Sequence, residues 1–402
     1  MAAPVPRFLP ADRVRNLPPY IFARVFALRD GALAQGRRVY DMGVGNPDGR
    51  PPAHVVQALV DAVGDPAANV HRYSTFDGSP ALRRAIAHWY ERRFGVALAP
   101  DAQTLPLIGS KEGLANLMRA YVNRGDVVII PSPCYPAYFG AARLCEAEIH
   151  EMELSEARGY QPDFDAIPAD VAGRAKLLLL NYPNNPTGGV CELGLYERAL
   201  AFCDRHGILL VSDIAYSELS LDPACSPPSA LQVPGAAERV VEFQSLSKSH
   251  NMAGWRVGFV AGCAEVVATL GRLKSNVDFS LFGAIQAAAA AALTGDQSIC
   301  RDNAALYRRR RDLVLETWRA LGWRLEPPRA TMYVWGHVPR AYGDDDWAFV
   351  HDLFAKTGVL LSPGSGFGVY GKGCVRASLG LEESALRDAM AACAAADLDW
   401  RG

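Results

Sequence analysis

The 402-residue sequence lacks the patterns typical of disulfide-bonded, metal-binding, membrane or secreted proteins. Its nine cysteines are scattered and never spaced as CxxC, so we expect neither a disulfide framework nor a metal site. No run approaches the ~20 apolar residues of a membrane helix. The amino end has no continuous apolar stretch typical of a secretory signal. These absences predict a cytoplasmic protein without a membrane partner.

A strong charge of either sign is also missing. The 41 basic and 43 acidic side chains leave a formal net charge of -2, and half of the residues are hydrophobic. This is the balance of an ordinary globular protein, so no nucleic-acid partner is expected. The four consecutive arginines at 308–311 lie in a predicted helix, where one basic turn is typical of a solvated face.

Apolar runs alternate with helical segments between residues 176 and 260, which favours a parallel sheet covered by helices on both faces. A crossover helix is expected at 191–207. The predicted buried strands are 127–133, 176–183, 208–216, 239–247 and 255–262. The fold class is therefore α/β.

Helix caps locate two further helices, 79–95 and 303–322, each of which ends at a glycine. After residue 323 the pattern changes to a strand pair within 323–339, a helix near 345–357, a β-like run and a last helix from about 382. This mixture predicts a separate, smaller α+β lobe. Residues 366–371 match GxGxxG, but a β-like run follows them instead of a helix, which argues against a dinucleotide site.

The stretch SLSKSHNMAGWRVG carries the main chemical signal, because Lys248 follows an apolar run and is flanked by hydroxyl groups. Burying an ammonium is costly unless its pKa falls, and a lowered pKa lets lysine form a Schiff base with an aldehyde. Ser245, Ser247 and Arg256 offer donors that suit a phosphate dianion. The alternative interpretation is a surface turn with an incidental lysine.

Two further groups follow neighbouring predicted strands. Asp213 ends ILLVSD, and Asn185 lies in the turn NYPNNPTGG. The carboxyl ends of strands in an open α/β sheet line the ligand crevice. A carboxylate there can keep a pyridine nitrogen protonated, while Asn185 and Tyr216 can hydrogen-bond a ring oxygen. Taken alone, Asp213 is equally a cap or turn residue, and NPTG is a common turn composition.

In order and spacing, NNPTG, Asp213 with Tyr216, SLSK and Arg256 resemble the fold-type I, class I and II aminotransferases over nearly the whole chain. The resemblance implies the aspartate aminotransferase-like fold of PLP-dependent transferases, with a mainly parallel seven-stranded sheet between helices. It implies a large domain at 46–288 and a small domain formed by 1–45 and 289–402. The implied cofactor is pyridoxal 5'-phosphate, and the implied assembly is a homodimer with a composite site.

The resemblance also assigns roles to the matching residues. It makes Lys248 the Schiff-base lysine and proton shuttle, pairs Asp213 with the pyridinium, and directs Asn185 and Tyr216 to the ring oxygen. The residues implied to hold the phosphate are Ser110 and Lys111 of GSKEG, Ser245, Ser247 and Arg256.

Four other positions complete the predicted site. Tyr135 would stack on the cofactor ring, although a proline-flanked tyrosine is also ordinary loop packing. Tyr73 would reach a phosphate in the partner subunit, with a core anchor as the alternative. Arg376 would clamp the substrate α-carboxylate with its planar fork, assisted by Asn185 and by the backbone of Gly45.

The implied activity is ping-pong transfer of the α-amino group of an L-amino acid to a 2-oxo acid. Segments such as LPPYIFARV and PPRATMYVWGHVP look most like the alanine:2-oxoglutarate branch, with LL-diaminopimelate and aspartate aminotransferases as alternatives. A C–S lyase or ACC-synthase-like enzyme would use the same cofactor residues on the same fold. A transcription regulator would need a DNA-binding module, and only about forty residues precede GVGNPDG.

Overall fold

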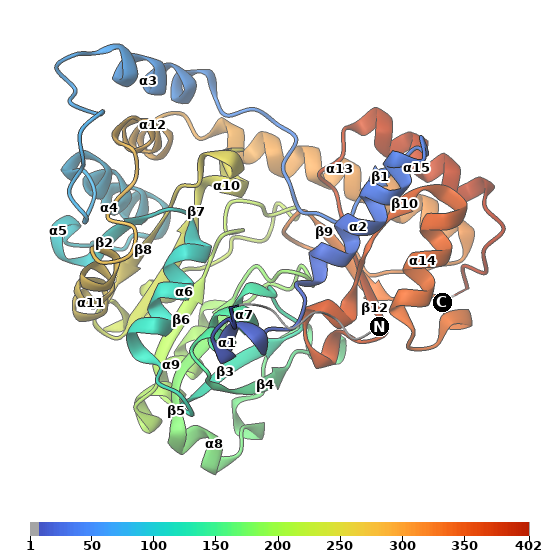
Figure 1. The fold of residues 1–402 in the computed structure, drawn as a ribbon, viewed down its shortest axis with the longest axis horizontal. Coiled ribbons are helices and arrows are strands. Elements are labelled where there is room, and N and C mark those ends of the chain that lie inside the picture. Colours follow the sequence, from blue (N-terminus) through green and yellow to red (C-terminus); the bar gives the residue numbers. More distant parts are fainter. Residues whose placement is uncertain (1–7, 402) are drawn as a thin grey trace.

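The chain folds into two lobes, which lie at the left and right of the ribbon in Figure 1. The structure is a computed structural model that describes residues 8–401. Residues 1–7 and 402, which the predicted small domain includes, lie outside the described residues. None of the helices within 8–401 is long and apolar enough to cross a membrane.

The larger lobe is built on a seven-stranded sheet in the order β2-β8-β7-β6-β5-β3-β4, in which β8 runs antiparallel to both of its neighbours. This confirms the predicted seven-stranded, mainly parallel sheet. The strands are β2 (Thr104–Leu107), β3 (Val127–Ser132), β4 (Glu148–Glu153), β5 (Ala175–Asn181), β6 (Leu209–Asp213), β7 (Val240–Ser245) and β8 (Gly258–Gly262).

Successive side chains of a strand point to opposite faces of the sheet, and helices bury both faces here. In β5, Leu178 and Leu180 pack into one hydrophobic cluster, whereas Leu177 and Leu179 pack into another. The helices over the first face include α3 (Ala53–Gly64), α4 (Pro80–Phe94), α9 (Leu193–His206) and α12 (Gly283–Thr294). Those over the second are α6 (Ser110–Tyr121), α7 (Ala137–Leu144) and α11 (Ala264–Lys274). Two shorter helices, α5 (Pro100–Gln103) and α8 (Ala169–Arg174), complete this lobe.

Caps fix three of the four predicted helix ends. The Ser79 side chain accepts the N–H of Leu82 at 3.2 Å, and Gly95 ends α4 with a left-handed φ of 68°. Gly322 likewise ends α13 (Ser298–Leu321) with φ 105°, which glycine adopts without a side-chain clash. The predicted start of the second helix at Asn303 is wrong: α13 begins five residues earlier, and the Asn303 side chain donates to the backbone oxygen of Ser249 at 3.0 Å instead of capping the helix.

The smaller lobe has its own hydrophobic cluster, to which Trp318, Phe349 and Leu386 contribute. Its three-stranded sheet has the order β11-β12-β9, and β1 pairs with β10 beside it. The strands are β1 (Tyr40–Asp41), β9 (Tyr333–His337), β10 (Val359–Leu360), β11 (Ser362–Pro363) and β12 (Cys374–Ser378). Its helices are α2 (Ile21–Ala34), α13, α14 (Asp346–Thr357) and α15 (Glu383–Ala395), and α1 (Asp12–Arg15) precedes them. The predicted domain boundaries themselves stay a prediction.

Several boundaries differ from the sequence prediction. β6 ends at Asp213 and β7 at Ser245, because each chain turns away from the sheet there; Lys248 lies on the short helix α10 (Leu246–Ser249) and not on a strand. The predicted strand pair within 323–339 is wrong. The one strand within this segment is 333–337, and its partner is β12. Residues 364–367 and 369–371 form 3-10 turns, and a strand, β12, follows them instead of a helix, as the sequence predicts.

Candidate active site

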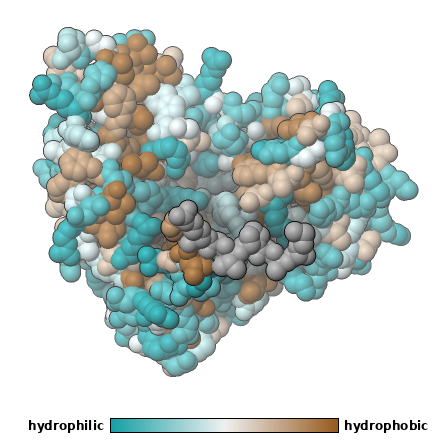
Figure 2. All heavy atoms as spheres, viewed as in Figure 1, coloured by the Kyte–Doolittle hydropathy of each residue, from teal (hydrophilic) through white to brown (hydrophobic). Residues whose placement is uncertain are grey.

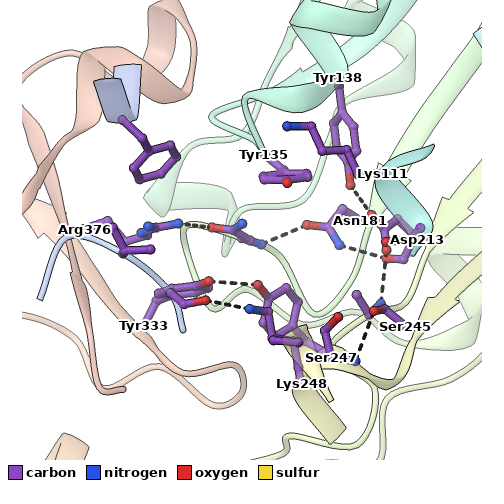
Figure 3. A pocket seen from close by; sticks show the side chains of 18 of the residues that line it. Lys111, Tyr135, Tyr138, Asn181, Asp213, Ser245, Ser247, Lys248, Tyr333 and Arg376 are labelled. Carbon is purple, nitrogen blue, oxygen red and sulfur yellow. Dashed lines mark hydrogen bonds between the residues drawn. The ribbon is translucent and has the colours of Figure 1, made fainter. Parts of the chain in front are cut away.

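A cavity of about 250 Å³ lies between the carboxyl ends of the central strands and the small lobe. Figure 3 looks into it, and Figure 2 shows the surface hollowed between the two lobes. Every predicted site residue except Tyr73 lines this cavity. The structure thus brings together Gly45, Ser110, Lys111, Tyr135, Asn185, Asp213, Tyr216, Ser245, Ser247, Lys248, Arg256 and Arg376.

One end of the cavity gathers groups that suit a phosphate. Ser245 and Ser247 come from the end of β7 and the start of α10, and Ser110 begins α6. Lys111 and Arg256 add two cations, and burial together with the charge of Arg256 lowers the pKa of Lys111. The first N–H groups of a helix have no partners within it and favour an anion. This end therefore matches the predicted phosphate site.

The chain at this end is held tightly. Gly109 has φ 79°, which favours glycine, and a Cβ there would lie 2.2 Å from Nη2 of Arg256 and displace its guanidinium. Glu112 accepts the N–H of Ile108 at 3.0 Å and pairs with the buried Lys274 at 3.3 Å. The loop before α6 is therefore fixed from the side opposite the cavity.

Lys248 faces the middle of the cavity. Its Nζ donates to the backbone oxygen of Gly45 at 2.6 Å. Burial lowers its pKa, the nearby Tyr333 opposes this, and Arg376 and Arg256 lower it further. A lysine with a lowered pKa holds a larger neutral fraction, and the neutral amine is both nucleophile and base. This is the chemistry that the sequence predicts for Lys248.

Asp213 ends β6 at the bottom of the cavity. Its carboxylate accepts the hydroxyl of Tyr138 at 2.6 Å and the N–H of Ala215 at 3.1 Å. Burial raises its pKa to about 6, and these two hydrogen bonds oppose the rise. Asn181, the last residue of β5, donates to the backbone oxygen of Asp213 at 2.8 Å. The carboxylate is thus fixed in place, and a buried carboxylate is stabilised by a cationic partner.

Arg376 reaches the opposite side of the cavity from β12. Its Nη1 donates to Oδ1 of Asn185 at 2.9 Å and its Nη2 to the backbone oxygen of Gly43 at 2.7 Å. A guanidinium has five N–H donors, so three remain for a ligand. Because Oδ1 of Asn185 accepts from Arg376, the amide Nδ2 of Asn185 is the group left to donate into the cavity.

Tyr333 joins these groups, and sequence reasoning missed it. Its hydroxyl lies 2.9 Å from that of Tyr216, and Cζ of Arg376 lies 4.2 Å from its ring centre. A Cβ on Gly45 would come within 1.9 Å of the Tyr333 hydroxyl. Gly45 is therefore a glycine because the tyrosine occupies the space of a side chain, a reason beyond its predicted backbone contact.

An aromatic wall was also missed. Tyr20, Phe22 and Phe26, from the start of α2, cover the cavity beside Arg376. Phe22 packs in the small cluster that contains Trp335 and Phe367. Tyr138 follows the predicted strand 127–133 and Asn181 begins the quoted segment NYPNNPTGG, so their positions at or after the ends of buried strands could have singled them out. The helix that carries Phe22 and Phe26 offers no comparable signal.

Tyr73 does not reach this cavity. It is 95% exposed and packs edge-on against Phe279, with 5.7 Å between the ring centres. The alternative of a core anchor is therefore wrong, whereas the role in a partner subunit stays a prediction. Other exposed apolar side chains lie along α3 and in the segments near Tyr73 and Phe279; they are Val56, Val60, Val63, Phe76, Val277 and Phe282. Figure 2 shows hydrophobic residues gathered over α3.

The residues present fit pyridoxal 5'-phosphate. Cations, hydroxyls and a helix N-terminus gather at one end of the cavity and could hold the phosphate, and the buried carboxylate of Asp213 could pair with the ring nitrogen. An amine of lowered pKa lies between these groups, together with hydroxyl and amide donors that suit a ring oxygen. Gly109, which has no side chain, would let the backbone before α6 approach a phosphate.

Comparisons with known proteins agree with this geometry. The family model "Aminotransferase class I and II" matches residues 37–392. The chain is 47% identical to the LL-diaminopimelate aminotransferase of Desulforudis audaxviator, over 95% of this chain and 96% of that protein. It is 39% identical to a solved probable N-succinyldiaminopimelate aminotransferase of Thermus thermophilus, with a TM-score of 0.86 and coverage of 92% and 100%. A single mutant of Thermus thermophilus aspartate aminotransferase is 30% identical, with a TM-score of 0.89 and coverage of 96% and 99%.

Proposed function

Because this chain belongs to the class I and II aminotransferases, which depend on pyridoxal 5'-phosphate, we propose that its amino donor is LL-diaminopimelate and its acceptor a 2-oxo acid. The observation that carries the proposal is the group of relatives named LL-diaminopimelate aminotransferases, 39–47% identical over at least 94% of this chain. These relatives favour the LL-diaminopimelate alternative over the alanine:2-oxoglutarate type that the sequence suggested first.

The charges of the cavity support a donor with two carboxylates. Arg376 offers a buried guanidinium with three free N–H groups. Lys111 is a second cation on the cavity wall, solvent-exposed, with its Nζ 5.0 Å from the ring centre of Tyr20. Arg376 would hold the carboxylate next to the reacting carbon and Lys111 the distant one. This assignment gives Lys111 a second role beside its predicted contact with the phosphate.

The chain's own residues supply binding, orientation and proton transfer. When bound, pyridoxal 5'-phosphate supplies an aldehyde carbon and an electron-accepting ring. Lys248, kept partly neutral by burial, would take the proton from the donor's α-carbon at its Nζ and return it to complete the transfer. Asp213, held by Tyr138 and Ala215, would keep the ring nitrogen protonated. Arg376 would orient the donor so that its α-proton faces Lys248.

A panel of donors with 2-oxoglutarate as acceptor tests the proposal. We expect kcat/KM for LL-diaminopimelate to exceed the values for L-alanine and L-aspartate by at least about tenfold, the effect of one extra charged contact. Lys111→Met should narrow this preference, because the distant carboxylate loses its partner. L-alanine as the best donor would overturn the substrate assignment. Release of ammonia and a 2-oxo acid without an acceptor would support the lyase alternative.

We also propose that two copies form a dimer in which Tyr73 completes the partner's site. Its nearly complete exposure and the apolar side chains around it support an interface there. Tyr73→Ala should weaken cofactor binding about tenfold or more, since one hydrogen bond to a charged group is lost. Mixing inactive Lys248→Ala subunits with Tyr73→Ala subunits should restore activity, because hybrid dimers contain one complete site.

Two outcomes would contradict the dimer proposal: a monomer in sedimentation analysis, or a mixture no more active than its components. We further propose a cytoplasmic location, as expected for a biosynthetic enzyme like its bacterial relatives. Cell fractionation with an antibody checks it, and recovery of the protein in the extracellular fraction would refute it.

A further inference from the structure

Tyr333 is the buried titratable group of the cavity to which none of the predicted roles applies. It lies on β9 of the small lobe, only 2% exposed, and its hydroxyl is 2.9 Å from that of Tyr216 on the large lobe. Figure 3 shows Tyr333 beside Lys248 in the cavity. The pair therefore joins the two lobes at the point where the cofactor's ring oxygen is expected.

Three contacts hold Tyr333 in this orientation. The guanidinium of Arg376 lies over its ring, with 4.2 Å from Cζ to the ring centre. Its hydroxyl occupies the space beside the Cα of Gly45, whose carbonyl oxygen accepts from Lys248. The third contact is the hydrogen bond with Tyr216. A side chain fixed this way has little rotational freedom left to lose when a ligand binds.

The two hydroxyls differ in acidity. Burial alone would raise the pKa of Tyr333, but the cations of Arg376 and Lys248 and the bond with Tyr216 outweigh it, so the pKa is lowered. Burial raises the pKa of Tyr216 well above its ordinary value. Either hydroxyl can donate in the bond between them. Each phenol carries a single proton, so when Tyr216 donates its proton to a ring oxygen in the cavity, Tyr333 is the group that donates to the oxygen of Tyr216.

We propose that Tyr333 is a positioning residue, which acts through Tyr216 to aim and strengthen the hydrogen bond that Tyr216 donates to the cofactor's ring oxygen. Donation to the oxygen of Tyr216 polarises its O–H bond, so hydrogen bonds in such a chain reinforce one another. The proposal rests on the proposed use of pyridoxal 5'-phosphate at this site, and it does not depend on the identity of the donor.

The test is an absorbance titration of cofactor-loaded protein against pH, without substrate. Tyr333→Phe keeps the ring and removes the hydroxyl. A weaker bond to the ring oxygen leaves more negative charge there, and the chromophore then holds its proton more tightly. We expect the pH at the midpoint of the absorbance change to rise by roughly half to one unit, the size expected when one hydrogen bond is lost.

Further variants separate a positioning role from a general loss of packing. Tyr216→Phe should raise the midpoint of the titration at least as far as Tyr333→Phe does. The double variant should have the same midpoint as Tyr216→Phe alone, because Tyr333 acts through Tyr216. Tyr90→Phe is the matched control: it also removes a buried hydroxyl, bonded at 3.1 Å to Glu242 outside the cavity, and should leave the midpoint unchanged.

Two results would overturn the proposal. One is a midpoint in Tyr333→Phe equal to that of the unmodified protein. The other is additive shifts in the double variant, which would mean that Tyr333 acts independently of Tyr216. If the unmodified protein bound no pyridoxal 5'-phosphate, no titration would be observed, and the proposed function would fail instead.

Discussion

Replacing Lys248 by alanine should reduce amino transfer by at least about 10³-fold, because the variant loses both the nucleophile for the cofactor and the base for the donor's α-proton. The cavity would otherwise be preserved. The main contact of the Lys248 side chain is a hydrogen bond to Gly45, so the phosphate groups at the far end should keep their places. Single-turnover absorbance with each donor measures the loss.

A second variant separates charge from nucleophilicity. Lys248→Arg keeps a positive charge in the same place, but a guanidinium stays protonated at any ordinary pH. We expect it to be as inactive as Lys248→Ala. Borohydride should link the cofactor covalently to the unmodified chain and to neither variant. If Lys248→Ala turned over unaided, or if the borohydride adduct were found at another residue, the central assignment of the site would be wrong.

Loss of Arg376 should produce the second largest effect, an increase in KM of about 10²-fold for every donor and acceptor alike. A charge-assisted, bidentate contact is worth roughly twice a neutral hydrogen bond, and the fork also supports Asn185 and Gly43. Arg376→Lys should recover only part of the loss, because one ammonium cannot reproduce a planar fork.

The dissociation constant of the cofactor distinguishes this role from a general disturbance of the site. Arg376 lies on the side of the cavity away from the phosphate groups, so cofactor binding should change by less than about threefold. We would measure it by equilibrium dialysis of Arg376→Ala beside the kinetic constants. An unchanged KM would remove Arg376 from the substrate site. A large loss of cofactor would mean that the variant damages the pocket as a whole.

Sequence reasoning located the residues that follow buried strands. Lys248, Asp213 and Asn185 each come after an apolar run, and strands that run side by side in parallel bring their carboxyl ends to one edge. The short helix that carries Lys248 was not predicted, because four residues give too little periodicity to be recognised. The sequence thus predicted which residues meet at the ends of the strands, but not the backbone conformation that carries each of them.

The residues contributed by the small lobe were harder to find. Arg376 was predicted only through family resemblance, since a single arginine in a β-like run carries no signal of its own. Tyr333 lies on a strand whose first four residues are all buried, so nothing in the sequence pattern marks its hydroxyl as facing a ligand. Tyr20 and Phe22 reach the cavity because α2 of the small lobe begins beside it, a tertiary arrangement without a local sequence signature.

The origin of the aromatic wall has a practical consequence. Tyr20, Phe22 and Phe26 belong to a segment near the amino end that supplies none of the groups around Lys248 and Asp213. We expect this wall to contribute, beside Lys111, to selectivity for the donor's side chain, so part of that selectivity would be encoded apart from the groups that transfer the amino group. Directed evolution toward new amino acids has its shortest route through these three codons, and fusion tags are safer at the carboxyl end.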